Sequence, residues 1–250
     1  MNLTERKGFE QQLLRKISPF LGKMDEDLFE HFYIKPNPVS GKYPKNVNGI
    51  IVNRMLDVDI NEGIKEKIKN YGISIRTLRL EKNNRIKQSV SLPNIHFEDI
   101  VNESWENSTL KQYLELTRYL FVVLKKTTDF HYKLVGAKFW SITDSELETK
   151  VKDAWIETVN TIKHGVELNR DLQTNRVTNN FINASARRII HVRPRADKSS
   201  YMAYNPNADK LPVPANWKNK PDNYSDDWMT RQCFWINNTY IEKQVSDFFD

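Results

Sequence analysis

Apolar residues with helical spacing alternate along this chain with segments of period two, and this alternation limits the folds open to it. Residues 9–20 and 147–162 show the helical pattern. Residues 73–80, 119–124 and 134–142 carry the alternation, or the β-branched and aromatic side chains, typical of strands. We therefore predict an α/β or α+β fold in which one mixed central sheet is flanked by helices.

Shorter signals complete the expected order of elements in the first half of the chain. We predict a short helix after Asp25, a Pro- and Gly-rich loop over residues 35–45, and a third helix over residues 46–56. A hairpin through Asn83-Asn84 is expected to return along residues 86–92.

The second half contains the clearest helix start. Thr143 and Glu146 have the spacing of a capping box, and Gly165 is expected to end the helix that follows. After it we predict a polar loop (166–187), a short strand (188–192), a Pro- and Asn-rich loop (205–224), a final strand (233–236) and an amphipathic helix.

Composition excludes several classes of protein. Hydrophobic residues make up 39% of the 250 residues and aromatic residues 11%, which is too many for a disordered chain. No apolar run approaches the ~20 residues of a membrane-spanning helix, and the first residues lack the apolar core of a secretory signal, so we expect a cytoplasmic protein. The one cysteine, Cys233, excludes an internal disulfide and a Cys-based zinc site, and we expect it to be buried.

Positive charge is concentrated in two segments. Residues 61–90 hold eight Lys or Arg against three acidic residues, and residues 176–200 hold six against one, although the whole chain carries only +6. Such concentration is typical of a phosphate-binding cleft if the fold brings the segments together. Two ordinary basic surface patches are the alternative.

Other catalytic classes find little support. The chain has eight glycines and no Gly-rich phosphate loop, and no Ser nucleophile has a recognisable elbow. The histidines show no metal-ligand spacing; they are His31, His96, His131, His164 and His191.

A series of short motifs resembles the MutH-like family of GATC-specific endonucleases. In order these are Ser104–Ser108 (SWENS), Arg118-Tyr119-Leu120, Lys138-Phe139-Trp140, Asp153-Ala154-Trp155, Gly165, Ile190–Ala196 (IHVRPRA) and Phe234–Asn238 (FWINN). The resemblance covers roughly residues 9–245. It implies a single restriction-endonuclease-like MutH domain over residues 1–250, with lobes of about 1–100 and 101–250 around a DNA-binding cleft. The chain looks most similar to the carboxy-terminal half of the Sau-type GATC-cutting type II restriction endonucleases, which resembles a degenerate, regulatory copy of the catalytic half.

The resemblance also implies that the cleavage residues have been lost. The family cuts DNA with a Glu on a helix, an Asp, and a Glu-x-Lys on a strand, which hold Mg²⁺ and activate water. Matching Gly49 and the Tyr71–Ile73 turn to that pattern puts Asn53, Lys67, Ser74 and Arg76 at these four positions. We therefore expect no catalytic residue, no metal and no cofactor in this domain, with Mg²⁺ needed only by a catalytic partner domain. If this alignment is wrong, one of five carboxylates supplies a displaced metal site: Asp57, Asp59, Glu62, Glu66 or Glu81.

The same resemblance assigns the DNA-binding residues. Arg193, Pro194 and Arg195 match the family's recognition loop, where Arg binds guanine in the major groove and Pro stiffens the loop; contact with phosphate alone is the alternative. The remaining candidates are Lys42, Lys45, Arg76, Arg187, Arg188, Lys198 and Trp235. For Lys45 a solvated loop position, and for Trp235 a core position, stay open.

We therefore predict a non-cleaving, regulatory domain of a type II restriction endonuclease that binds double-stranded DNA containing GATC. Its other expected partner is a catalytic MutH-like domain of the same protein. Two rival functions stay open. One is an active Mg²⁺-dependent GATC endonuclease, and the other is a protein-interaction module with a relic cleft.

Overall fold

The structure, a computed structural model, describes residues 3–128 and 131–249. The chain divides into two compact units, each assembled from separate stretches of sequence. The first unit comprises Met1–Gln88, Leu116–Ser141 and Ile241–Asp250, and the second comprises Ser89–Glu115 and Ile142–Tyr240.

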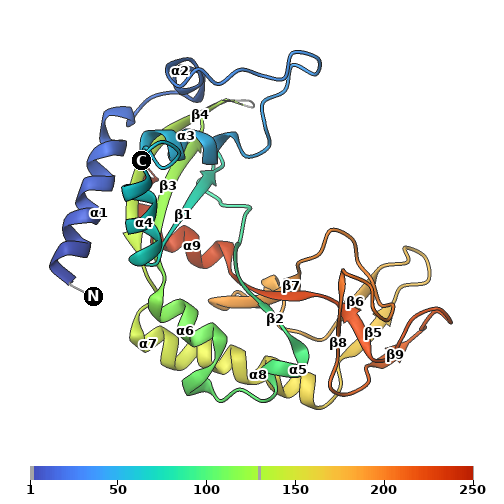
Figure 1. Cartoon of the computed structure of the whole chain (residues 1–250). Helices are drawn as coiled ribbons and strands as arrows, with labels where there is room; N and C mark the ends of the chain where they lie inside the picture. Colours follow the sequence, from blue (N-terminus) through green and yellow to red (C-terminus); the bar gives the residue numbers. More distant parts are fainter. Residues whose placement is uncertain (1–2, 129–130, 250) are drawn as a thin grey trace. The chain divides into compact units, whose positions relative to one another are not determined.

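The first unit is a three-stranded sheet packed against helices. Its strands are β1 (Ile73–Leu80), β3 (Arg118–Lys126) and β4 (Tyr132–Trp140), in the order β1-β3-β4, with β1 parallel to β3 and β3 antiparallel to β4. Its helices are α1 (Leu3–Ile17), α2 (Asp25–His31), α3 (Val47–Met55) and α4 (Glu62–Asn70), with a 3₁₀ turn at Ser18–Phe20 (Figure 1). The end of α9 (Asn238–Gln244) and a 3₁₀ turn at Ser246–Phe248 complete it.

The core of the first unit lies between its sheet and the first four helices. Leu13 and Ile17 of α1 belong to the same buried cluster as Leu120 and Val122 of β3. The alternation of β3 sends Leu120, Val122 and Leu124 to this face. The opposite face of the strand carries Tyr119 and Phe121, which stack on one another at 5.7 Å between ring centroids. Both faces of β3 are therefore buried, as its nearly continuous apolar sequence predicts.

The second unit combines helices with three small sheets. Its helical segments are α5 (Phe97–Ile100), α6 (Thr109–Leu116), α7 (Asp144–Glu146), a π-helical turn at Leu147–Val151, α8 (Lys152–Lys163), and 3₁₀ turns at Trp105–Asn107 and Ala184–Ala186. Its strands are β2 (Val90–Ile95), β5 (Glu167–Arg170), β6 (Val177–Asn179), β7 (Ile190–Pro194), β8 (Ala208–Lys210), β9 (Asn216–Lys218), β10 (Trp228–Thr230) and β11 (Gln232–Ile236). The sheet orders are β2-β11-β7, β6-β5-β9 and β10-β8.

The long helical stretch begins and ends where the sequence predicts. The Thr143 hydroxyl accepts a hydrogen bond from the Glu146 N–H at 3.2 Å and donates one to the Glu146 carboxylate at 2.9 Å. Gly165, with a φ of +90°, follows the last helical turn. The left-handed conformation that ends the helix is the one that glycine adopts without strain.

Two sequence predictions about the sheets are wrong. The strands form four separate sheets in the described residues and do not form one mixed sheet. The expected hairpin is reduced to a single bridge between Leu80 and Ile86, because β2 pairs with β11 and β1 pairs with β3. The strand that follows residue 86, β2, therefore pairs with β11, which lies almost 140 residues later in the chain.

The sequence also missed regular structure in polar stretches. α4 was not predicted, although Asn61 caps it by accepting a hydrogen bond from the Ile64 N–H at 3.1 Å. The short strands β5 and β6 lie in the expected loop 166–187, and β8 and β9 lie in the expected loop 205–224.

No helix in the described part of the chain is both long and apolar enough to cross a membrane.

Candidate nucleic-acid interface

The β2-β11-β7 sheet carries an exposed arginine over an aromatic ring. Cys233 pairs with Arg193 and Trp235 pairs with His191, so the four side chains share one face of the sheet. The Arg193 guanidinium lies 4.9 Å from the centre of the Trp235 ring, and Arg193 is exposed. A guanidinium stacked in this way keeps its hydrogen-bond donors available at the ring's edge while the stack limits its rotamers.

The strand extends further than the sequence predicts. Arg193 and Pro194 were expected in a recognition loop, but they are the last two residues of β7. β7 is an edge strand of its sheet, where the missing N–H of proline is tolerated. A strand holds Arg193 at a fixed register against Cys233, which is a more rigid position than a loop provides.

Arg195 is anchored by its neighbours. Its Nη1 donates to the Leu92 carbonyl at 3.1 Å and lies 3.8 Å from the Cys233 sulfur, while its backbone N–H donates to the Arg231 carbonyl at 3.0 Å. Burial raises the pKa of the Cys233 thiol, so the sulfur beside Arg195 is a neutral thiol at pH 7. Cys233 is buried as predicted, and it also positions Arg195. The clue in the sequence was its place two residues before Trp235, on the same face of one strand.

His191, on the same face of the sheet, is a buried neutral base. It is 1% exposed, and neither ring nitrogen has a hydrogen-bond partner among the described residues. Burial and the nearby Arg193 guanidinium together lower the pKa of His191 to about 4. The imidazole therefore adds no positive charge next to Arg193 at pH 7.

The buried histidine predicts a loss of stability in mild acid. In the unfolded chain His191 binds a proton below a pKa of about 6.5, whereas in the folded protein it does so only near 4. Unfolding therefore takes up a proton in this range, and we expect its free energy to fall by about 2 kcal/mol between pH 7 and pH 5 from this group alone. Urea unfolding at both pH values measures the change. In the His191→Leu variant the unfolding free energy should fall by about 2 kcal/mol less between pH 7 and pH 5. If it falls as much as in the wild type, other groups are responsible for the loss.

The four positions matched to the family's cleavage residues all lie in the first unit. Ser74 and Arg76 are two apart in β1, on the face opposite the core-packed Ile73 and Ile75, and the Arg76 guanidinium donates to the Ile75 carbonyl at 3.3 Å. Asn53 is half-buried on α3. Lys67 is exposed on α4, with its ammonium 5.7 Å from the centre of the Phe9 ring. Both helices pack against the face of β1 that carries Ile73 and Ile75, so Asn53 and Lys67 lie on elements across the strand from Ser74 and Arg76.

These four residues do not fit a magnesium ion. Mg²⁺ in proteins takes oxygen ligands, and carboxylates supply the negative charge that offsets its dehydration. Asn53 and Ser74 offer only neutral oxygens, and Lys67 and Arg76 are cations. Among residues 3–128 and 131–249, no group of three or more His, Cys, Asp or Glu side chains is arranged to hold a metal ion.

Lysines pair with three of the five carboxylates named above as the alternative metal site. Asp57 contacts the Lys16 ammonium at 2.5 Å, Glu62 contacts Lys65 at 3.0 Å, and Glu81 contacts Lys87 at 3.2 Å. Asp59 and Glu66 are exposed.

The remaining candidate cations are exposed, but not all are unpaired. Lys42, Lys45, Arg187 and Lys198 are exposed. Arg187 adopts a left-handed backbone (φ +52°) at the end of a 3₁₀ turn. Arg188 forms an ion pair with Glu157 at 2.6 Å. A phosphate bound by Arg188 would therefore have to replace that carboxylate.

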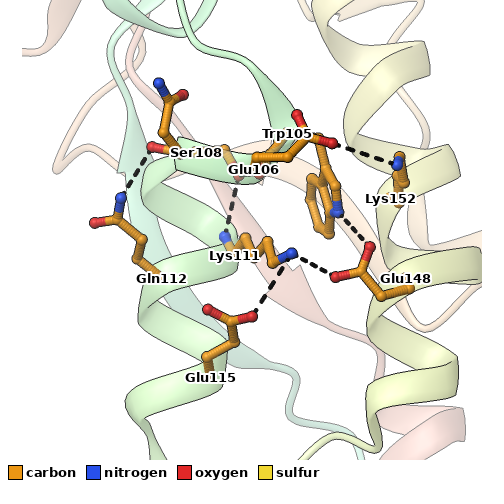
Figure 2. Close-up of polar contacts among 9 residues, drawn as sticks. Trp105, Glu106, Ser108, Lys111, Gln112, Glu115, Glu148 and Lys152 are labelled. Carbon is orange, nitrogen blue, oxygen red and sulfur yellow. Dashed lines mark hydrogen bonds and ion pairs between the residues drawn. The ribbon is translucent and has the colours of Figure 1, made fainter.

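The SWENS motif forms a structural junction (Figure 2). The Trp105 indole N–H donates to the Glu148 carboxylate at 2.9 Å, and the Lys111 ammonium contacts the same carboxylate at 2.5 Å. Lys111 also lies 5.8 Å from the centre of the Trp105 ring, and Lys152 pairs with Glu106 at 3.8 Å. The motif thereby ties the 3₁₀ turn, α6 and the start of the long helical stretch together within the second unit.

Comparison with known proteins identifies a relative of this chain among restriction enzymes. No protein-family profile matches the chain. The chain is 36% identical over 265 aligned residues to "Type II restriction enzyme Sau3AI" from Staphylococcus aureus, an alignment that includes 97% of this chain. The chain belongs to a Sau3AI-like family. The family resemblance predicted from the motifs is therefore confirmed. The chain spans about half (52%) of the length of Sau3AI.

Proposed function

We propose that this Sau3AI-like chain binds double-stranded DNA at GATC and acts as a non-cleaving, regulatory domain of a type II restriction enzyme. Support for DNA as the partner comes from its similarity to a restriction enzyme and from Arg193, which β7 presents in exposed form. Arginine is suited to reading guanine, because its fork can donate to O6 and N7 together.

The non-cleaving part of the proposal depends on one observation. The residues matched to the family's carboxylates and lysine are Asn53, Lys67, Ser74 and Arg76, which supply no carboxylate. A phosphodiester near such residues meets cations and hydrogen-bond donors in place of a metal ion. Residues of this kind would bind a phosphate without supplying the metal ion that hydrolysis requires. A catalytic MutH-like domain is the expected partner, because the chain spans only about half of Sau3AI.

Binding measurements in EDTA test the recognition part of this proposal. We expect the purified chain to bind a GATC duplex more tightly than a duplex of the same composition with the four bases permuted. Both affinities should fall as salt rises, because phosphate contacts release counterions. Equal affinity for the two duplexes at every salt concentration would contradict sequence-specific recognition.

A further inference from the structure

A shallow hollow at the end of β1 gathers more positive than negative side chains. It measures about 340 Å³ and is lined by Glu81, Lys82, Asn83, Arg85, Lys87 and Lys126. Four of these residues are cationic and one is anionic, and one of the cations, Arg85, also pairs with the Glu242 carboxylate at 3.6 Å. They come from the turn after β1 and from the end of β3, both in the first unit. We call this feature the β1-turn hollow.

A carboxylate of the protein itself holds two of the cations. Glu81 lies 3.2 Å from the Lys87 ammonium through one oxygen and 3.6 Å from the Lys126 ammonium through the other. The hydrogen bond from Lys87, with further attraction from both lysines, lowers the pKa of Glu81 below its usual value. Glu81 is thus an ionised anion whose two oxygens bridge the lysines, as two oxygens of a phosphate group would.

The turn that carries the hollow is held by several fixed contacts. The Glu81 N–H donates to the Arg85 carbonyl at 2.9 Å, and the Asn84 N–H donates to the Glu81 carbonyl at 2.9 Å. Ile86 is buried, and its N–H donates to the buried Glu242 carboxylate at 2.8 Å. The cations therefore project from an ordered turn, so less conformational entropy is lost when they bind an anion.

We propose that the β1-turn hollow binds a backbone phosphate of duplex DNA, which replaces Glu81 as the anion between Lys87 and Lys126. The inference rests on the DNA binding proposed above, but it concerns the first unit and not the sheet that carries Arg193. Two observations favour DNA backbone. One is the excess of cations in the hollow, and the other is the basic segment 61–90, which supplies Lys82, Arg85 and Lys87 and continues the positive charge beyond it. A phosphate contact carries no sequence information, so this site adds affinity and register without specificity.

Opposite charge changes at the hollow give opposite predictions. Lys87→Gln should weaken binding to the GATC duplex and to its permuted control by the same factor, about threefold to tenfold at low salt. It should also reduce the slope of log affinity against log salt by about one. Glu81→Gln should strengthen binding to both duplexes, about threefold, because it frees the lysines for phosphate. The matched controls are Lys65→Gln and Glu62→Gln, which remove the same charges from an exposed ion pair on α4.

The controls and a competitor define the results that would overturn the inference. It fails if Glu62→Gln strengthens binding as much as Glu81→Gln does, because only net charge would then matter. It also fails if Lys87→Gln leaves the affinity and the salt slope unchanged while the wild-type chain still prefers GATC, a result that leaves the proposed function standing. The inference also fails if millimolar inorganic phosphate displaces the duplex from the wild-type chain but not from Lys87→Gln. That result would identify the hollow as a site for small anions. A wild-type chain that binds neither duplex would overturn the proposed function as well.

Discussion

Replacing Arg193 with alanine is expected to remove most of the preference for GATC. Affinity for the GATC duplex should fall by about 5- to 150-fold, which corresponds to the 1–3 kcal/mol of one bidentate arginine–guanine pair. Affinity for the permuted duplex should change much less, because Arg193 makes no specific guanine contact in that duplex. Titrations of both duplexes in EDTA at one salt concentration give the ratio directly.

Two matched variants separate base recognition from charge. Arg193→Lys keeps the positive charge but loses the planar fork and the stack over Trp235, so it should lose nearly as much specificity as Arg193→Ala. Arg187→Ala removes one exposed cation from the same unit and should weaken both duplexes equally. If Arg193→Ala also weakens both duplexes equally, Arg193 contacts phosphate only.

Replacing Gly72 with alanine is expected to cause the largest loss of stability. Gly72 joins α4 to β1 with a φ of +63°, and a Cβ atom there would lie 2.2 Å from the Leu116 carbonyl oxygen. The Gly72 carbonyl also accepts a hydrogen bond from the Arg118 N–H at 2.9 Å, at the start of the pairing between β1 and β3. Backbone atoms on both sides must move, and we expect the variant to lose about 3 kcal/mol or more of unfolding free energy.

The matched control for Gly72 lies in α1. A Cβ added at Gly8 meets nothing within 4 Å, and Gly8 is helical, so Gly8→Ala should raise stability by roughly 0.5–1 kcal/mol. Urea unfolding of the two variants compares the same chemical change in two backbone settings. A Gly72→Ala protein as stable as the wild type would contradict the close approach between residues 72 and 116.

Local signals were enough to predict several elements. Period two and β-branched residues located β1 and β3, and the Thr143 cap with Gly165 located the long helical stretch. The pairing of strands was not predictable in the same way. Ile86 does form the first bridge of the expected hairpin, but β2 then joins β11, a partner about 140 residues away that no local pattern identifies. The four-sheet arrangement was missed for the same reason.

The candidate site divides along similar lines. Arg193 was predictable as a surface residue from its motif, whereas its stack over Trp235 depends on strand register. The Arg195 guanidinium contacts the Leu92 carbonyl, about 100 residues earlier in the chain. No local sequence pattern at either position predicts this contact. α4 was missed because its lysines suggested solvated charge, although the Asn61 cap and the pair Ile64 and Ile68 were visible signals.

The central claim, that this chain holds GATC DNA without cutting it, is tested most directly by one electrophoresis assay. Supercoiled plasmid containing GATC sites is incubated with excess purified chain and Mg²⁺, and samples are run with and without prior removal of the protein. We predict retarded plasmid in the first case and intact supercoiled plasmid in the second. Nicked or linear plasmid that depends on Mg²⁺ would contradict the claim.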